Sequence, residues 1–347
     1  MNAPTGQNPV LALATRSGHV ESWHRGAVAV RHGDELLLAI GDVEAPVFAR
    51  SATKPLQALP FVEHGLPERL GLPPEELAVV CASHDGAAVH TAAVRSLLAR
   101  GDLPESLLGC GPHAPFDTEA RLDLVRRGEK PARAHNNCSG KHTAFLLLAR
   151  QCGDDPATYL DPACRSQQEV AAAVAAMTGL PRPPEIGLDG CGAPTFRLPL
   201  SALATGFVRL ANPEALPPVR AAACRTILDA VGRAPVLLAG ERRLCTALIR
   251  TWPGQCFAKN GAEGVYAFGI AGIATGGRWP RGLGIAIKVD DGAERGYQPV
   301  LIDLLRHLDL LPDELPAALA AFHRLRLHNT QQKPVGDVYC VAPWDVR

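Results

Sequence analysis

The sequence predicts an α/β fold in which both ends of the chain form one mainly antiparallel sheet and the middle of the chain is helical. Two observations indicate this fold: strand patterns occupy the first fifty residues and return after residue 250, and residues 51–250 have a helical hydrophobic period. Because the terminal strands surround a helical middle, we expect the N- and C-terminal segments to share one sheet flanked by helices. The 347 residues can bury a large core, and we expect a sheet subdomain (about 1–50 plus 251–347) and a helical subdomain (about 51–250).

Individual elements follow from local patterns. The first strands are expected at 10–14, 27–31 and 36–40, and His32-Gly33-Asp34 is a good hairpin turn between the last two. Helices are expected at 53–63, 87–100, 139–151, 164–177, 216–231 and 240–250, with Pro/Gly-rich connectors at 181–184 and 212–218. Strands return at 255–258, 264–269 and 283–289, and helices follow near 298–308 and 312–323.

Composition excludes several classes of partner. Thirty-five basic residues balance 35 acidic ones, and Lys/Arg runs do not extend beyond pairs, so the chain has no electrostatic footprint for nucleic acid or anionic lipid. We therefore expect a small-molecule partner or a second copy of the chain.

Residues 1–7 lack a basic stretch followed by an apolar core, and no apolar segment approaches bilayer length, so we expect a cytoplasmic protein. The ten scattered cysteines are expected to be free thiols, ligands or core residues.

The segment Ser51-Ala-Thr-Lys54 places a hydroxyl and an amine three residues apart in a chain with 29 arginines and 6 lysines. Such a chain should keep lysine mainly where a deprotonatable amine is needed. On a helix these two positions share a face, which suits a serine nucleophile whose proton is taken by a neutral lysine. The alternative is a helix N-terminus with Ser51 or Thr53 as the cap and a solvated Lys54.

Two further clusters extend this pattern. In Cys81-Ala-Ser83-His84-Asp85-Gly86, which follows the apolar run 77–80, a strand end or helix start would expose Ser83, although the cluster alone could be a helix cap. Lys259-Asn260-Gly261 lies at an expected strand-turn junction and alone could be a surface turn. Together the three clusters have the chain order of the motifs in penicilloyl-serine enzymes. A second lysine near the first would favour a neutral amine in one of them, and Ser83 could relay a proton.

Two cysteines are flanked by glycine and asparagine rather than by core residues. They occur in His135-Asn-Asn-Cys138-Ser-Gly-Lys141-His142 and in Gly187-Leu-Asp-Gly-Cys191-Gly192. A soft-metal interpretation would use the thiolates of Cys138 and Cys191 with His142 or an unusual neutral Lys141. Backbone turns or substrate binding are the alternatives. A phosphate loop at 139–143 is excluded, because the upstream glycine and the Ser/Thr directly after the lysine are missing.

Together with a segment near the N-terminus, residues 16–26, these clusters resemble the corresponding motifs of the rhizobial-type (class 3, asparaginase II) L-asparaginases. The segments that carry the resemblance are 16–26 (Arg-Ser-Gly-His-Val-Glu-Ser-x-His-x-Gly), 50–57 (Arg-Ser-Ala-Thr-Lys-Pro-Leu-Gln), 81–86, 135–142, 187–192 and 259–261. The resemblance implies a serine-β-lactamase-like or glutaminase-like α/β fold, a single catalytic chain that forms a homodimer, and hydrolysis of L-asparagine to L-aspartate and ammonia.

The resemblance also implies site residues. It pairs Ser51 with Lys54 and Ser83 with Lys259, with Ser51 as the nucleophile. It further implies one zinc-like ion per subunit, which supports substrate binding and is held by Cys138, Lys141 and Cys191.

Four residues are assigned to the substrate. From its charge and its position between two glycines, Asp189 suits the substrate α-amino group. Arg50 or His84 could face the α-carboxylate, and Asn137 is assigned to substrate binding as well.

Departures from the penicilloyl-serine motifs define the alternatives. The third motif is Lys-Asn-Gly instead of Lys-Thr-Gly or Lys-Ser-Gly, and the second is Ser-His-Asp, which argues against β-lactam chemistry. A glutaminase differs by one methylene in the substrate, which a pocket discriminates by only about 1–3 kcal/mol. A β-lactamase or peptidase acting on cell walls would need an export signal. In a non-enzymatic protein, Cys138, His142 and Cys191 would form a structural or sensing metal site, and Ser51 would have no role.

Overall fold

The structure is a computed structural model that describes residues 8–344. The seven N-terminal residues, from which we argued that a leader is absent, lie outside the described part. Strands from both ends of the chain form one eight-stranded antiparallel sheet in the order β10-β11-β1-β2-β9-β8-β7, with β3 also paired to β2. These strands are β1 (Val10–Arg16), β2 (His19–His32), β3 (Glu35–Ile40), β7 (Cys256–Asn260), β8 (Val265–Ile270), β9 (Leu283–Val289), β10 (Arg324–His328) and β11 (Pro334–Cys340). The predicted α/β fold with a shared terminal sheet is confirmed.

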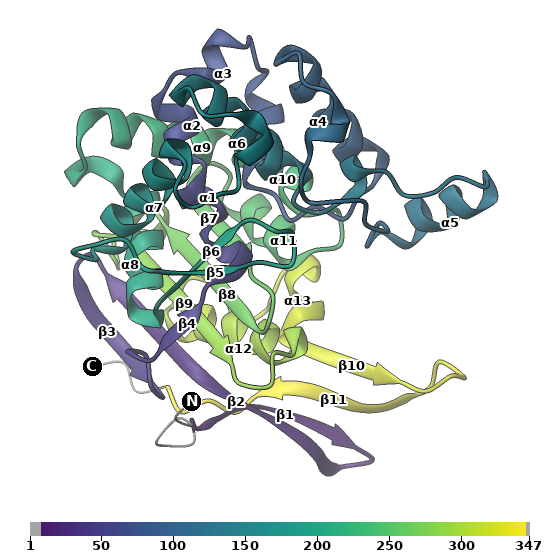
Figure 1. Cartoon of the computed structure of the whole chain (residues 1–347). Coiled ribbons are helices and arrows are strands. Elements are labelled where there is room, and N and C mark those ends of the chain that lie inside the picture. Colours follow the sequence, from purple (N-terminus) through teal and green to yellow (C-terminus); the bar gives the residue numbers. More distant parts are fainter. Residues whose placement is uncertain (1–7, 345–347) are drawn as a thin grey trace.

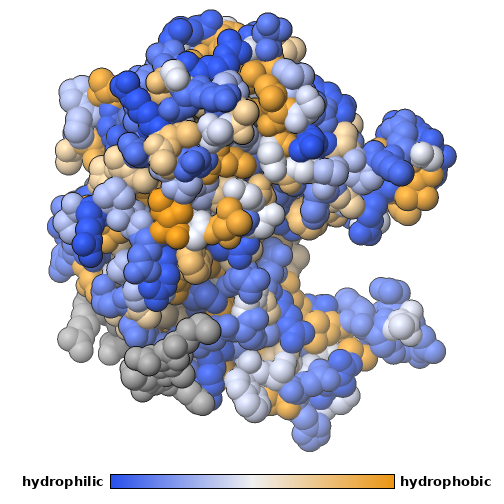
Figure 2. Space-filling view, viewed as in Figure 1, coloured by the Kyte–Doolittle hydropathy of each residue, from blue (hydrophilic) through white to orange (hydrophobic). Residues whose placement is uncertain are grey.

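Strand β2 connects the two halves of this sheet. Its first half pairs with β1, and its second half, a continuous buried run from Ala27 to Val30, pairs with β3 and β9. At Gly26 a Cβ would lie 2.2 Å from the carbonyl oxygen of Lys288, so only glycine allows this approach to β9. Figure 1 shows the hairpins β1/β2 and β10/β11 projecting from the body on the same side as α5. Figure 2 shows the hollow between these projections.

Helices fill the middle of the chain and lie above the sheet in Figure 1. The α-helices are α1 (Lys54–Gln57), α2 (Leu59–Glu63), α3 (Leu66–Arg69), α4 (Ala88–Arg100), α5 (Thr118–Arg126), α6 (Ser139–Cys152), α7 (Arg165–Thr178), α8 (Leu200–Ala211), α9 (Pro218–Arg233), α10 (Pro235–Leu238), α11 (Leu244–Thr251), α12 (Glu294–His307) and α13 (Ala317–His323). The 3-10 helices are η1 (Arg50–Thr53), η2 (Pro74–Cys81), η3 (Glu105–Leu107), η4 (Arg133–His135), η5 (Pro156–Thr158), η6 (Pro213–Ala215) and η7 (Gly272–Thr275). Among residues 8–344, no helix combines the length and apolarity needed to cross a bilayer.

Two local expectations are corrected. The continuous helix expected at 53–63 is divided into η1, α1 and α2, because Pro55 and Pro60 cannot donate backbone hydrogen bonds inside a helix. The segment before Ser83 is η2, and the Ser83 side chain after it is buried rather than exposed, with 4% of its surface accessible.

A second sheet, which the sequence analysis did not predict, positions the loop around Cys191. It contains β4 (Pro46–Phe48), β6 (Pro194–Pro199) and β5 (Glu185–Leu188) in that order. The chain leaves β4 through Ala49, whose N–H donates to the carbonyl of Phe196 in β6, and enters η1. Residues 50 and 51 are thereby held beside the β5–β6 loop. The boundary between a sheet subdomain and a helical subdomain stays a prediction.

Candidate active site

One buried hydroxyl group, that of Ser83, lies between two lysine amines. Lys54 Nζ, from the start of α1, lies 2.9 Å from Ser83 Oγ, and Lys259 Nζ, from β7, lies 2.8 Å from the same oxygen. All three side chains are buried. The structure therefore brings three of the four predicted catalytic residues into direct contact, although they are far apart in the sequence.

Lys259 has the environment of a proton acceptor. Burial, followed by the charge of Lys54, lowers the pKa of Lys259 to about 7. Its other contacts are to two oxygens of Asn260, the carbonyl at 2.8 Å and Oδ1 at 3.2 Å. None of these contacts is a carboxylate that would hold the amine protonated. Near neutral pH a large fraction of molecules therefore has a neutral amine in contact with Ser83.

Among the described residues, Lys54 contacts Ser83 and is not hydrogen-bonded to Ser51, the partner expected for it. Its amine donates to the carbonyl of Ala82 at 2.5 Å and contacts Cys138 Sγ at 3.2 Å. Within residues 8–344, no hydrogen bond joins Lys54 Nζ to Ser51 Oγ. Ser51 lies one turn earlier in η1 and is partly exposed.

The backbone just before Ser51 is strained. Arg50 has a φ of 51°, in the left-handed region that non-glycine residues rarely occupy. Its guanidinium contacts Asp189 Oδ1 in the β5–β6 loop at 2.7 Å. Although burial alone would raise the pKa of Asp189, the charges of Lys141 and Arg50 hold it below its usual value. An ionised carboxylate and a guanidinium therefore lie next to Ser51, and both are partly exposed.

Two thiols and an amine converge beside Lys54. Lys141 Nζ lies 3.3 Å from Cys191 Sγ, and Lys54 Nζ lies 3.2 Å from Cys138 Sγ. Interaction with the Cys191 thiol and with the nearby amines lowers the pKa of Cys138 well below its usual value, although burial opposes the shift, while the same interaction raises the pKa of Cys191. Burial alone would lower the pKa of Lys141, but the two sulfurs and Asp189 raise it. Two sulfurs in a buried site are ligands that zinc uses, whereas Lys141 can join them only after an incoming ion has displaced its proton, which the raised pKa opposes.

His84 and Asn137, the remaining substrate assignments, differ in exposure. His84 is fully buried and stacks on His90. The Gly86 N–H donates to His84 Nδ1, so Nε2 carries the ring proton and contacts Ser139 Oγ at 2.9 Å. Burial holds the pKa of His84 well below its usual value, so the ring is neutral and both of its nitrogens are occupied. This geometry does not favour contact with a substrate carboxylate, whereas Asn137 is partly exposed.

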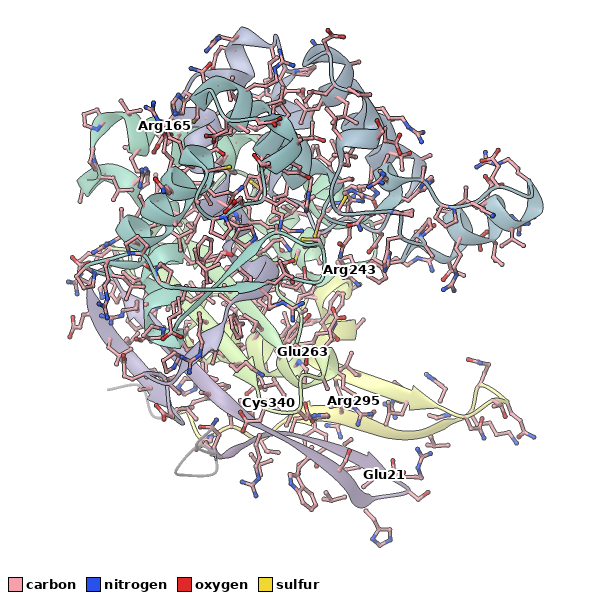
Figure 3. All side chains as sticks on the ribbon, viewed as in Figure 1. Glu21, Arg165, Arg243, Glu263, Arg295 and Cys340 are labelled. Carbon is pink, nitrogen blue, oxygen red and sulfur yellow. The ribbon has the colours of Figure 1, made fainter. Side chains whose placement is uncertain are left out.

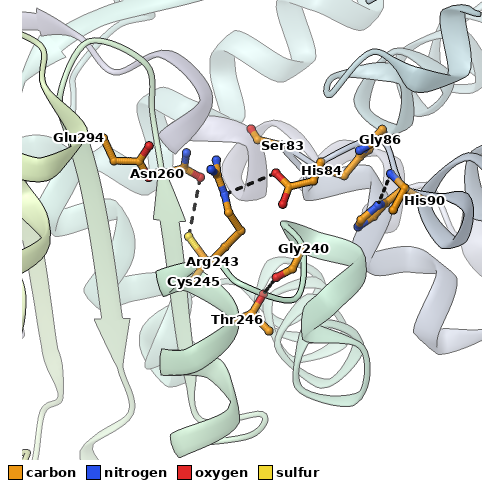
Figure 4. A network of polar contacts seen from close by, with 12 residues as sticks. Ser83, His84, Gly86, His90, Gly240, Arg243, Cys245, Thr246, Asn260 and Glu294 are labelled. Carbon is orange, nitrogen blue, oxygen red and sulfur yellow. Dashed lines mark hydrogen bonds and ion pairs between the residues drawn. The ribbon is translucent and has the colours of Figure 1, made fainter. Parts of the chain in front are cut away.

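Figure 4 shows several polar residues near Ser83 that were not identified from the sequence. Arg243 Nε lies 3.5 Å from Asp85 Oδ1. Cys245 Sγ lies 3.7 Å from Asn260 Oδ1 and accepts a hydrogen bond from Tyr266 at 3.3 Å. Arg243 and Cys245 come from a segment without a recognisable motif, so only the fold reveals their proximity to the lysines.

The comparisons identify the class and then the family. Residues 12–340 match the family model described as L-asparaginase II. The chain is therefore an amidohydrolase. It belongs to the L-asparaginase II family. A search of curated proteins found no match.

Solved structures similar to this chain include two of a probable glutaminase from Bacillus subtilis. One has 13% identity over 82% of this chain and 88% of the other, with a TM-score of 0.37. The second, a complex with 6-diazo-5-oxo-L-norleucine, has 13% identity over 82% and 84%, with a TM-score of 0.38. The protein Mglu in its native form has 14% identity over 84% and 66%, also with a TM-score of 0.38. Similarity at this level does not bear on the substrate of this chain.

Proposed function

We propose that this protein is an L-asparaginase that hydrolyses L-asparagine to L-aspartate and ammonia through a Ser-Lys acyl-enzyme mechanism. The observation that carries the proposal is the hydrogen-bonded series Lys54, Ser83 and Lys259, which ends in an amine with a pKa of about 7. A member of the L-asparaginase II family needs a base that is neutral at working pH, and this amine meets that requirement.

Ser51 is the nucleophile in this proposal, because it is partly exposed while Ser83 is buried. Ser51 Oγ attacks the side-chain amide carbon of asparagine. As its proton moves to Lys54, Lys54 passes a proton to Ser83, and Ser83 passes its own proton to neutral Lys259. Backbone N–H groups at the start of η1 help to stabilise the oxyanion.

Collapse of the tetrahedral intermediate breaks the C–N bond. The proton on Lys259 returns through Ser83 and Lys54 to the leaving nitrogen, so ammonia departs and an aspartyl ester remains on Ser51. Water then attacks this ester and gives its proton to the same relay. Aspartate leaves when Ser51 recovers its proton, so each lysine ends in its starting state.

The α-amino and α-carboxylate groups of the substrate match the pair next to Ser51. Asp189 binds the α-ammonium and Arg50 binds the α-carboxylate, and the pairing of the two side chains with each other keeps both charges in place without substrate. His84 contributes only through Ser139 and the backbone. Asn137 remains assigned to the substrate.

Zinc would be held by Cys138, Lys141 and Cys191, one ion per subunit. When bound, it would supply a Lewis acid that orients the substrate, while the serine supplies the nucleophile. A homodimer is part of the same proposal.

Ammonia release by the purified protein tests the function. We expect turnover with L-asparagine and weaker turnover with L-glutamine, whose extra methylene changes the fit by about 1–3 kcal/mol. A kcat/KM for glutamine equal to or above that for asparagine would replace the assignment with a glutaminase. Absence of ammonia from both amides would reject both.

A further inference from the structure

Three metal-ligating side chains converge at the end of α6 opposite the candidate active site. They are His64, which directly follows α2, Cys152, the last residue of α6, and Glu169 in α7. One ligand atom from each residue lies within 4.8 Å of the others, and His64 Nε2 lies 2.7 Å from Glu169 Oε2. We propose that His64, Cys152 and Glu169 form a second metal site, which binds one borderline-soft divalent ion such as Zn²⁺.

The donor set selects this class of ion. An imidazole nitrogen, a thiolate sulfur and a carboxylate oxygen are the three protein ligands that zinc uses, whereas Mg²⁺ and Ca²⁺ prefer oxygen. His64 and Glu169 each expose a little over a quarter of their side chains, and Cys152 is partly buried. An ion can therefore enter from solvent, and water can fill the fourth tetrahedral position.

Charge at this end of α6 also favours a cation. Burial, and then the carboxylates of Glu169 and Asp154, raise the pKa of the Cys152 thiol to about 11. Burial is the larger cause of this shift; the smaller part, which comes from the two carboxylates, indicates a negative field that attracts a divalent cation, and a bound cation stabilises the thiolate in turn. Cys152 also lies at the C-terminus of a 14-residue helix, where the backbone carbonyls favour positive charge.

Arg165 would compete with the ion for the carboxylate of Glu169. Its Nε lies 3.3 Å from Glu169 Oε1, while the other carboxylate oxygen contacts His64. Its side chain is 70% exposed, so it can move into solvent when a cation arrives. Figure 3 shows Arg165 on the outside of the helical region, well separated from Arg243.

This site is distinct from the one proposed at Cys138, Lys141 and Cys191. A 14-residue α-helix is about 20 Å long, so the two sulfur sites lie near opposite ends of α6. The second ion would join the ends of α2 and α6 to α7, three helices that already contact one another. Its expected effect is on the stability of the helical region and not on turnover.

Cobalt spectroscopy tests the proposal in the Cys138→Ser/Cys191→Ser variant, which lacks both sulfurs of the first site. After removal of metal, we expect one equivalent of Co²⁺ to bind and give a thiolate charge-transfer band. Zn²⁺ should displace Co²⁺ and raise Tm, while Mg²⁺ should do neither. Adding Cys152→Ser should abolish the charge-transfer band. The matched control Cys164→Ser, a partly exposed cysteine just before α7, should keep it.

Two more variants separate ligation from a structural role. His64→Asn should weaken Zn²⁺ binding by more than about tenfold, because losing a ligand costs at least as much as losing a partner that only orients one. Arg165→Ala should tighten binding, which the loss of a surface ion pair alone would not do. A folded double-serine variant that binds no Co²⁺, or whose band survives Cys152→Ser, would overturn the proposal. If the double-serine variant does not fold, the zinc content per chain is measured instead in single variants of the otherwise unaltered protein. Cys152→Ser must then remove one ion, and Cys164→Ser must remove none.

Discussion

The two ends of α6 carry cysteines in opposite electrostatic surroundings. Cys138, just before the helix, interacts with the Cys191 thiol and with the amines of Lys54 and Lys141, so its pKa is lowered well below the usual value. Burial and the nearby carboxylates raise the pKa of Cys152, at the other end, to about 11. Two cysteines at the two ends of one helix thus have pKa values shifted in opposite directions. Burial raises the pKa at both positions, and the neighbouring groups decide whether it is overcome.

Two buried lysines, Lys141 and Lys259, differ in the same way. Lys141 lies among sulfurs and near a carboxylate, and its pKa is raised although it is buried. Lys259 is equally buried but lies near a second amine, and its pKa falls to about 7. Burial is therefore the shared condition, and the partner decides whether the amine remains a cation or becomes a base. The following predictions test this contrast, from the largest expected effect to the smallest.

Ser51→Ala should lower kcat for asparagine by roughly a thousandfold or more, because removal of a nucleophile eliminates the covalent route. The fold should persist, since the side chain is small and partly exposed. Ammonia release and circular dichroism measure the two effects, with exposed Ser106→Ala as the control. Retention of more than a tenth of the activity would mean that Ser51 is not the nucleophile.

Lys259→Met should lower kcat/KM by about 10²–10⁴, the usual contribution of a general base. Lys259→Arg should be nearly as damaging, since arginine cannot give up its proton. Lys288→Met, which removes a lysine from the same sheet, is the control and should have little effect on kcat/KM. An active Lys259→Arg enzyme would mean that Lys259 contributes only its positive charge and does not act as a base.

The pH profile should report Lys259 directly. The proposed base must be neutral and the pKa of Lys259 is lowered to about 7, so kcat/KM for asparagine should rise with pH below about 7 and level off above it. The profile of the unaltered enzyme measures this titration. A profile that is flat between pH 6 and 8, on the order of one pH unit on either side of the expected pKa, would exclude this amine as the base.

Replacing Cys138 and Cys191 together by serine should remove the first metal ion and raise KM more than it lowers kcat, because we assign that ion to substrate positioning. A loss of about 10–100-fold in kcat/KM is expected, the range found when support of a metal site is removed. Elemental analysis and steady-state kinetics separate the two effects. A loss confined to kcat would place the ion in the chemical step.

Cys152→Ser should have the smallest effect on catalysis, with kcat/KM changed by less than about twofold, because the residue lies about 20 Å from the start of α6. Its effect should be on metal-dependent Tm alone. Thermal unfolding with and without Zn²⁺ measures that effect. A large loss of turnover in Cys152→Ser would mean that the end of α6 at Cys152 affects catalysis, and would contradict the assignment of separate roles to the two ends.

Regular elements with a clear period were predictable from the sequence. The strand expected at 283–289 is β9 with the same bounds, and the turn at His32-Gly33-Asp34 joins β2 to β3. Helix α8 was missed although Ser201, Thr205 and Arg209 recur along it at helical spacing; all of its residues except Arg209 are buried, so this polar stripe does not mark a solvent face. Strands β4, β5 and β6 are only three to six residues long, and β4 and β6 contain prolines, so their patterns are too short to distinguish from loops.

The candidate site was predictable as residue types and not as contacts. The spacing of Ser51 and Lys54 predicted a direct pair, but Pro55 limits the helix there, and Lys54 contacts Ser83 instead. The proximity of Lys259 to Lys54 was expected, whereas its low pKa depends on complete burial, which only packing determines. The contacts of Cys245 and Arg243 come from long-range packing and had no local signal.

Rapid acid quenching during turnover of asparagine, followed by peptide mass spectrometry, tests the Ser-Lys acyl-enzyme mechanism most directly. We predict an aspartyl ester on the peptide that contains Ser51 and none on the peptide that contains Ser83. An ester on Ser83 would reverse the roles of the two serines, and active enzyme without an ester on either serine would contradict covalent catalysis.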